Sequence, residues 1–236
     1  MWDFEQGEVL AFDKPLRWTS FDLVAKVRYN LCRKLGKNKL KVGHSGTLDP
    51  LATGVVIVCT GKKTKLIESL QYDVKEYVAT MQLGATTPSY DMEKEVDATY
   101  PTEHITRALV DETIPQFLGE QWQVPPMFSA VQINGKRAYE LARKGQEVEL
   151  KPKLLKIDEI EVLSFDEKAM LLTIRVVCSK GTYIRALARD IGERLHSGAY
   201  LTALRRTRVG DTRVEDCLTI ERFLEQLNEI EYVQNE

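Results

Sequence analysis

The sequence has few of the residues that mark disulfide-bonded or metal-binding proteins. Among its 236 residues are only four cysteines and three histidines, and no two cysteines form a C-x-x-C pair. Scattered cysteines of this kind are typical of reduced thiols in the cytoplasm, and they offer no ligand spacing for a structural zinc ion. The sequence therefore predicts a cytoplasmic protein without disulfide bonds or a metal site.

Long apolar runs and a basic N-terminus are also lacking. No apolar segment approaches the ~20 residues that a membrane-spanning helix needs. The chain begins MWDFE, which is acidic where a signal peptide would be basic. We therefore expect neither a membrane span nor a secretion signal.

The chain has little net charge, −2 at pH 7, but its charges are unevenly distributed. Residues 175–213 hold nine basic and three acidic side chains, whereas residues 215–236 hold seven acidic side chains and one arginine. Such asymmetry can create a basic face for nucleic acid on a nearly neutral protein. Ordinary solvated surface is the simpler interpretation of the charge runs taken alone.

A loop-like stretch at residues 43–54, GHSGTLDPLATG, precedes a buried apolar run at residues 55–59. Asp49 is the only acidic residue between Arg33 and Lys65, and eight basic residues lie in that window. Glycine and proline at this density exclude a regular helix and permit tight backbone turns. On composition alone, a turn aspartate bonded to its own backbone is the more common interpretation, and a catalytic carboxylate is the alternative.

The order of strands and helices indicates the fold class. Alternating and helical apolar spacing predicts strands and helices mixed without a regular βαβ repeat, which favours an α+β fold with a large, mostly antiparallel mixed sheet flanked by helices. In the first helix, which Thr19 and Ser20 cap, Phe21 is expected to share the apolar face with Val24 and Val27. We expect a single domain over residues 1–236. The predicted strands are 7–15, 55–60, 75–83, 129–133, 154–165, 169–178 and 200–209, and the predicted helices are 19–35, 62–70, 102–118, 138–144, 183–195 and 220–227.

Residues 43–54 resemble the signature of the TruB-type tRNA pseudouridine synthases. Further segments resemble the family's other motifs, in the family's order, and the resemblance covers about residues 7–227. One such motif is moderately specific, whereas several in order over nearly the whole chain are highly specific and favour the catalytic interpretation of Asp49. These segments are DKP at 13–15, KEY at 75–77, PPMFSA at 125–130, NGKRAYELAR at 134–143, CSKGTYIR at 178–185 and LRRT at 204–207.

The resemblance implies a pseudouridine synthase fold and an isomerase that converts the uridine at position 55, in the T arm of tRNA, to pseudouridine. It implies no metal and no organic cofactor, and tRNA as the partner, gripped by an insertion at about residues 124–152. We expect a monomer without an obligate protein partner. The sequence departs from the family in two ways. The C-terminal PUA domain that family members often carry is expected to be absent, and residues 87–91 follow the family's Thr-x-Thr-x-Asp pattern only in part, so Asp91 receives no role.

The resemblance also implies roles for five site residues. Asp49 is the essential carboxylate, whether it meets the base or the ribose first, and Arg185 keeps it ionised. Tyr77 stacks on the uracil ring, Leu204 packs on the other side, and His44 fills the space that the extruded base leaves. Without the motifs, Arg185 would be a solvated helix charge, Tyr77 and Leu204 core residues, and His44 a loop histidine bonded to backbone. The loop's glycines would let the backbone approach the nucleotide.

A larger set of basic residues is predicted to bind the substrate. Lys14 supports the catalytic loop together with Pro15. The remainder are candidates for phosphate contacts, which position RNA without reading its sequence. These are Lys136, Arg137, Arg143, Lys180, Arg205, Arg206 and Arg208.

Two other functions stay open at this point. The first is an RNA-binding or tRNA-folding protein without catalysis, which would not require Asp49, Tyr77 and Arg185 together. The second is a synthase of the same fold that acts on another RNA, such as ribosomal RNA. The His44 loop and the insertion favour tRNA.

Overall fold

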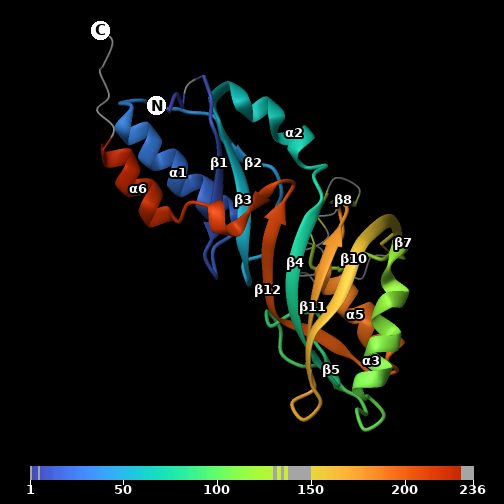
Figure 1. Ribbon diagram of the computed structural model, residues 1–236. Coiled ribbons are helices and arrows are strands. Elements are labelled where there is room, and N and C mark those ends of the chain that lie inside the picture. Colours follow the sequence, from blue (N-terminus) through green and yellow to red (C-terminus); the bar gives the residue numbers. More distant parts are fainter. Residues whose placement is uncertain (1, 5, 130–131, 134–135, 138–149, 230–236) are drawn as a thin grey trace. The chain divides into compact units, whose positions relative to one another are not determined.

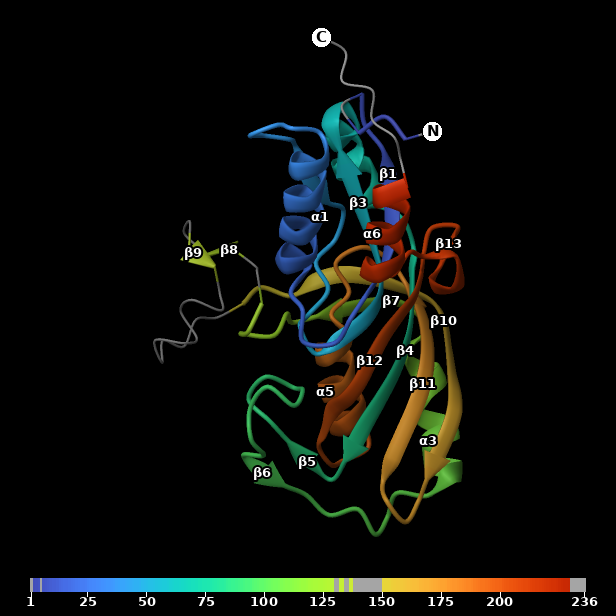
Figure 2. The ribbon, with the colours of Figure 1, turned by 90° about the vertical axis from the view of Figure 1, so that its left-hand side faces the viewer.

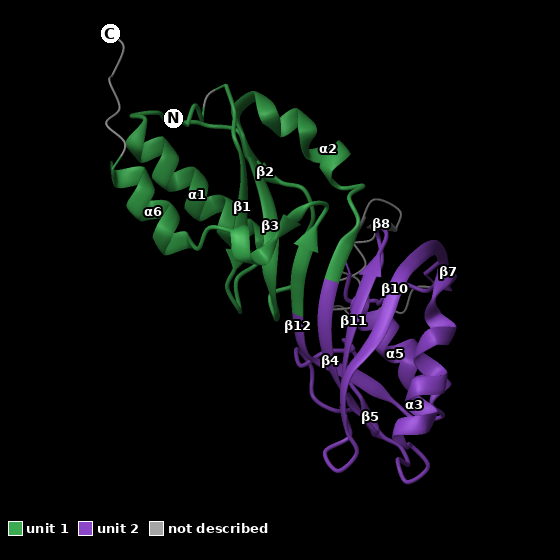
Figure 3. Cartoon of the chain, in the orientation of Figure 1, with its two compact units in different colours: residues 1–76, 205–236 green, residues 77–204 purple. Residues whose placement is uncertain are grey.

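The computed structural model describes residues 2–4, 6–129, 132–133, 136–137 and 150–229 (Figure 1). The chain forms two compact units (Figure 3): unit 1 comprises residues 1–76 and 205–236, and unit 2 comprises residues 77–204. The chain leaves unit 1 within strand β4 (Lys75–Leu83) and returns within strand β12 (Ala199–Val209). That residues 1–236 act as one catalytic domain stays a prediction.

Unit 1 contains a buried strand, β3 (Ala52–Thr60), between antiparallel neighbours. β1 (Val9–Lys14) pairs along its length, and β2 (Val42–His44) pairs near its end. Every β3 residue from Gly54 to Thr60 is buried, and Val55 and Ile57 pack in one cluster with Val209, Val214 and Leu70. β3 begins three residues earlier than predicted. The short strand β13 (Thr212–Arg213) pairs with the end of β12.

Helices α1 (Ser20–Lys34) and α6 (Ile220–Glu229) lie side by side in unit 1 (Figures 1 and 2). Thr19 caps α1, as the sequence predicted, and it forms a capping box with Asp22 that fixes the start of the helix. In α6, Phe223 packs edge-on against Phe12 of β1, with ring centroids 5.3 Å apart. The expected burial of Phe21 is wrong: this side chain is 66% exposed, and Leu23 takes its place on the buried face.

The predicted helix at residues 62–70 is a 3-10 turn, η1 (Gly61–Leu66), followed by one helical turn, α2 (Ile67–Leu70). Neither contains a fully buried residue. Most helical stability comes from packing an apolar face, so this segment lacks the contacts that would extend it. Another 3-10 turn, η3 (Val214–Asp216), lies just before α6.

Unit 2 is built on antiparallel strands. β10 (Lys153–Asp166) pairs on one side with β11 (Leu171–Cys178) and on the other with β7 (Gly119–Gln123). The order continues from β11 through β4 to β12. The predicted hairpin of residues 154–165 and 169–178 is therefore confirmed, as is the α+β class with a large, mostly antiparallel sheet.

The helices of unit 2 are α3 (Arg107–Thr113), which continues as the 3-10 turn η2 (Ile114–Phe117), and α5 (Ile184–Arg194). The helix predicted over 102–118 is shorter, because Thr106 caps it and Pro115 lies in η2. The strand β7 that follows was not predicted. The predicted helix at 138–144 lies outside the described residues.

The remaining short strands are β5 (Ala85–Thr86), β6 (Ala98–Thr99), β8 (Gln132–Ile133) and β9 (Lys136–Arg137).

In the part of the chain that the structure describes, no helix has the length and apolar character to cross a membrane.

Candidate active site

Asp49 lies on the loop between β2 and β3, and the start of α1 braces this loop. Leu48 is buried, and its N–H donates to the Ser20 hydroxyl oxygen at 2.9 Å. The same hydroxyl donates to the Leu48 carbonyl at 3.2 Å. The Asp49 carbonyl accepts from the Ala52 N–H at 3.0 Å, which closes the turn. The Asp49 side chain is thus half-buried on a backbone that is fixed on both sides.

Arg206, in β12, holds the same loop from within unit 1. Its guanidinium donates to the carbonyl oxygens of Val55 at 2.7 Å, Gly46 at 3.1 Å and Thr47 at 3.4 Å. The side chain is only 2% exposed. A buried guanidinium whose bonds go to loop carbonyls is not presented to RNA. Arg206 therefore has a structural role in place of the predicted phosphate contact.

Gly54 of β3 packs directly against the backbone of Arg206. Its φ is +109°, and a Cβ at this position would overlap the Arg206 carbonyl oxygen. This glycine serves close packing between strands, which is a different role from the predicted approach to a nucleotide.

Replacing Gly54 by Ala is expected to destabilise the protein by roughly 3 kcal/mol or more, because backbone strain and overlap add. Equilibrium unfolding in urea measures the change. Gly46→Ala is the matched control: the nearest atom to its added Cβ would be 3.8 Å away, so we expect less than about 1 kcal/mol. Equal losses in the two variants would contradict the packing role.

Lys14, at the end of β1, supplies a buried cation near the loop. The side chain is fully buried, and its Nζ donates to the carbonyls of Pro15 at 2.9 Å and Trp18 at 2.6 Å. Burial lowers the pKa of Lys14 to about 8, although the negative charge of Asp49 opposes this shift. Lys14 therefore places a buried positive charge near Asp49 within the same unit. Its support of the catalytic loop stays a prediction.

The low pKa of Lys14 predicts a pH-dependent stability. Between about pH 8 and pH 10.5 the folded protein has lost this proton while the unfolded chain still binds it. The free energy of unfolding should therefore rise with pH in this window, by up to ~1.4 kcal/mol per pH unit from this group. Urea unfolding of the wild type and Lys14→Met across the window isolates the effect. A constant difference between the two proteins would contradict it.

His44 and Arg205 are two further predicted site residues of unit 1. His44 is half-buried, and its Nδ1 accepts the Gly46 N–H at 3.3 Å. Burial lowers the pKa of His44, so the ring is neutral at pH 7 with its proton on Nε2. Arg205 binds both Asp13 carboxylate oxygens, at 3.2 and 2.7 Å, and the Thr53 hydroxyl at 3.0 Å.

Arg185 lies in the first turn of α5 in unit 2 and is 5% exposed. Its guanidinium donates to the carbonyls of Ser89 at 3.1 Å and Phe128 at 2.8 Å. Its Nε lies 3.8 Å from a carboxylate oxygen of Asp91. The interpretation of Arg185 as a solvated helix charge is therefore wrong.

Asp91, to which the sequence assigned no role, is an acidic neighbour of Arg185. It is 7% exposed, its carboxylate accepts the Glu93 N–H at 2.9 Å, and its carbonyl accepts the Thr87 hydroxyl at 2.7 Å. These bonds fold residues 87–93 so that the carboxylate faces Arg185. The partial Thr-x-Thr-x-Asp pattern was the signal that could have identified it.

Gln123 fixes the start of α5 against the segment that follows β7. Its side chain accepts the Tyr183 N–H at 2.9 Å and donates to the Tyr183 carbonyl at 3.1 Å. One turn further along α5, Arg189 donates to the Val124 carbonyl at 3.0 Å. These bonds fix the register between α5 and residues 123–128, so the Phe128 carbonyl can accept from Arg185.

The remaining predicted site residues vary in exposure. Tyr77 is 7% exposed at an inward position of β4, Leu204 in β12 is half-buried, and Lys180 is exposed. Lys136 and Arg137 form β9, and Arg143 lies outside the described residues.

A cavity of about 360 Å³ lies in unit 2, between η2, β7, β10 and α5, and none of the predicted site residues lines it. Among the described residues no cluster of His, Cys, Asp and Glu could hold a metal ion.

Two family sequence patterns cover most of the chain. The TruB family pseudouridylate synthase N-terminal domain matches residues 33–184, and the tRNA pseudouridylate synthase B C-terminal domain matches residues 185–235. The chain belongs to the TruB family. It is therefore a pseudouridine synthase, as the motifs predicted, and an enzyme of the isomerase class.

Curated relatives of the TruB family share the full length of the chain. The chain is 67% identical over 236 residues to tRNA pseudouridine synthase B of Phocaeicola vulgatus, covering 99% of this chain and all of that protein. It is 66% identical to the protein of the same name from Bacteroides thetaiotaomicron, covering 99% and 98%.

Solved structures of more distant relatives share the fold. A chain of a Cbf5–Nop10–Gar1 complex matches with a TM-score of 0.70 and 28% identity, over 97% of this chain and 58% of that one. A chain of an H/ACA ribonucleoprotein bound to a substrate RNA containing 2′-deoxyuridine matches with a TM-score of 0.68 and 27% identity, over 97% and 57%. The TruB-family chain thus spans a little over half the length of these proteins.

Proposed function

We propose that this TruB-family enzyme converts the uridine at position 55, in the T arm of tRNA, to pseudouridine. The observation that carries the proposal is the family's signature loop, with Asp49 half-buried on a braced turn near the cation of Lys14. The relatives' name, tRNA pseudouridine synthase B, supports tRNA as the substrate.

The reaction is an isomerisation in which every atom is conserved. The bond from ribose C1′ to N1 of uracil breaks, the detached base turns, and a new bond joins C1′ to C5. The C5 proton leaves, and N1 gains a proton. No redox step occurs, so a carboxylate and groups that move a proton provide sufficient chemistry.

We assign the site residues the roles that the family's motifs imply. Asp49 supplies the essential carboxylate, and Arg185 keeps it ionised, because a nearby cation favours the charged form. Tyr77 and Leu204 hold the two faces of the uracil ring. Extruding the paired, stacked base costs a few kcal/mol, which the neutral, planar ring of His44 offsets by filling the vacated stack.

Basic residues around the site are proposed to bind RNA phosphates. Of the candidates, Lys180 is exposed, and Arg205 is 42% exposed at its side chain while bound to Asp13. The enzyme would select its RNA by the shape of the folded RNA and by contacts to flipped bases. Contacts to base edges along a duplex would not be needed. Lys136, Arg137, Arg143 and Arg208 complete the proposed set.

A tritium-release assay tests this function. A T-arm hairpin labelled at C5 of uridine is incubated with the pure protein, and the isomerisation should release the label into water. A hairpin with cytidine at the target position, labelled in its other uridines, is the control and should release none. Absence of release from the first hairpin, or equal release from both, would contradict the proposed target.

We further propose that the enzyme acts as a monomer in the cytoplasm without an obligate protein partner. All four cysteines are free thiols in the structure, which suits a reducing compartment. Sedimentation of the pure protein, alone and with one equivalent of tRNA, tests the oligomeric state. A single protein copy per complex is expected, and two copies would contradict the proposal.

A further inference from the structure

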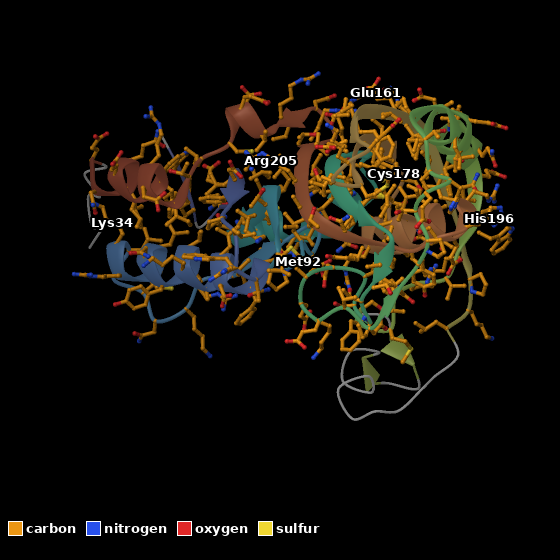
Figure 4. All side chains as sticks on the ribbon, turned by 90° about the horizontal axis from the view of Figure 1, so that it is seen from below. Lys34, Met92, Glu161, Cys178, His196 and Arg205 are labelled. Carbon is orange, nitrogen blue, oxygen red and sulfur yellow. The ribbon has the colours of Figure 1, made fainter. Side chains whose placement is uncertain are left out.

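The outer face of α1 exposes aromatic side chains that a structural helix would bury. Phe21 and Tyr29 are 66% and 65% exposed, although α1 has a complete buried face formed by Leu23, Val24, Val27 and Leu31. Lys26 and Arg33 are exposed on the same helix, three or four residues from Tyr29 and therefore beside it. In Figure 4 the side chains on the outer side of α1 stand away from the strands of unit 1.

The charge of residues 23–48 has one sign. From Leu23 to Leu48 there are seven basic residues and no acidic residue. The loop after α1 adds exposed Lys37 and Lys39. Asp22, in the first turn, is bonded to Thr19 in the capping box. We call Phe21, Lys26, Tyr29, Arg33, Lys37 and Lys39 the α1 face.

The α1 face leads away from the catalytic loop. The start of α1 is fixed to that loop through Ser20 and Leu48. The helix has 15 residues, so its far end lies about 20 Å from this junction at 1.5 Å per residue. With one phosphate per ~3.4 Å of axis on each strand, this length faces about six nucleotides.

We propose that the α1 face binds tRNA outside the arm that carries the target uridine. The partner is RNA because two features fit it together: basic side chains pair with phosphates, and exposed aromatic rings stack on unpaired bases. A protein partner with an acidic surface is the other occupant that this chemistry would fit, and unchanged tRNA binding in the variants below would favour it. The inference rests on the proposed function only in taking tRNA as the substrate.

Charge reversal on the α1 face tests the inference. Lys26→Glu/Arg33→Glu should weaken binding of full-length tRNA by roughly tenfold. The slope of log K against log [salt] should become less steep, by the amount expected for the loss of about one to two phosphate contacts. Binding of a short T-arm hairpin should stay within twofold, and tritium release from that hairpin should be unchanged. Lys153→Glu/Lys168→Glu, which changes the charge equally at exposed positions of unit 2, should leave tRNA binding within twofold.

A second variant separates stacking from charge. Phe21→Ser/Tyr29→Ser should weaken full-length tRNA binding about fivefold or more with an unchanged salt slope. Thermal unfolding confirms that the variants stay folded, since none of these side chains is buried. The inference is overturned if the α1 variants bind tRNA like the wild type, if the unit 2 control weakens equally, or if the hairpin loses as much affinity as the tRNA. Failure of hairpin turnover in the wild type would instead contradict the proposed function.

Discussion

Replacing Asp49 by Asn should reduce pseudouridine formation by at least about 10³-fold, while the affinity for tRNA stays within several-fold. The amide has the size of the carboxylate but carries no charge, so it can neither attack a carbon nor accept a proton. The bonds that hold the loop run through the Asp49 backbone and through Leu48, so the fold should persist. Tritium release under single-turnover conditions and a filter-binding titration measure the two quantities.

Asp211→Asn is a suitable control for Asp49→Asn, because Asp211 is an exposed acid in the same unit. It changes the net charge identically and should keep full activity. If Asp49→Asn retained turnover within tenfold of the wild type, Asp49 would be a turn aspartate, and the reaction would need another carboxylate. A parallel loss of tRNA binding would show that Asp49 positions RNA.

The second large effect concerns Arg185. Arg185→Met should reduce turnover by about 100-fold or more. It should also lower the free energy of unfolding by about 3–5 kcal/mol. The loss of stability arises because Asp91 is buried and would lose the cation 3.8 Å away. Activity alone therefore cannot separate a catalytic role from a structural one.

A double variant separates the two roles of Arg185. In Arg185→Met/Asp91→Asn the buried carboxylate becomes a neutral amide, so more than half of the lost unfolding free energy should return. Turnover should stay as low as in Arg185→Met, because the cation proposed for Asp49 is still missing. Recovery of activity together with stability would mean that Arg185 only holds the fold. Urea unfolding and tritium release measure both effects on the same preparations.

The sequence predicted best the helices and strands whose ends and spacing depend on residues close together in the chain. Thr19 and Asp22 form a capping box, and α1 begins where that box places it. The alternating apolar spacing of two runs and the short turn between them were enough to predict the antiparallel pair β10 and β11. The same kind of pattern misled for Phe21, because spacing places a residue near the apolar face but does not say whether another element covers it.

The long-range contacts of the site could not be predicted in the same way. Arg206 is more than 150 residues from the loop that it holds, and nothing in its neighbourhood separates a buried guanidinium from one that binds phosphate. Asp91 and Arg185 are likewise distant in sequence, and only the fold of residues 87–93 aims the carboxylate at α5. The motifs predict which residues matter, and the structure gives Arg206 and Arg185 their partners within their own units.

Mapping every pseudouridine in a full-length tRNA transcript after incubation with the pure protein tests the central claim most directly. The account predicts one new pseudouridine, at the uridine in position 55 of the T loop, and none with Asp49→Asn. A modified uridine at any other position, an unmodified transcript, or the same product with Asp49→Asn would contradict it.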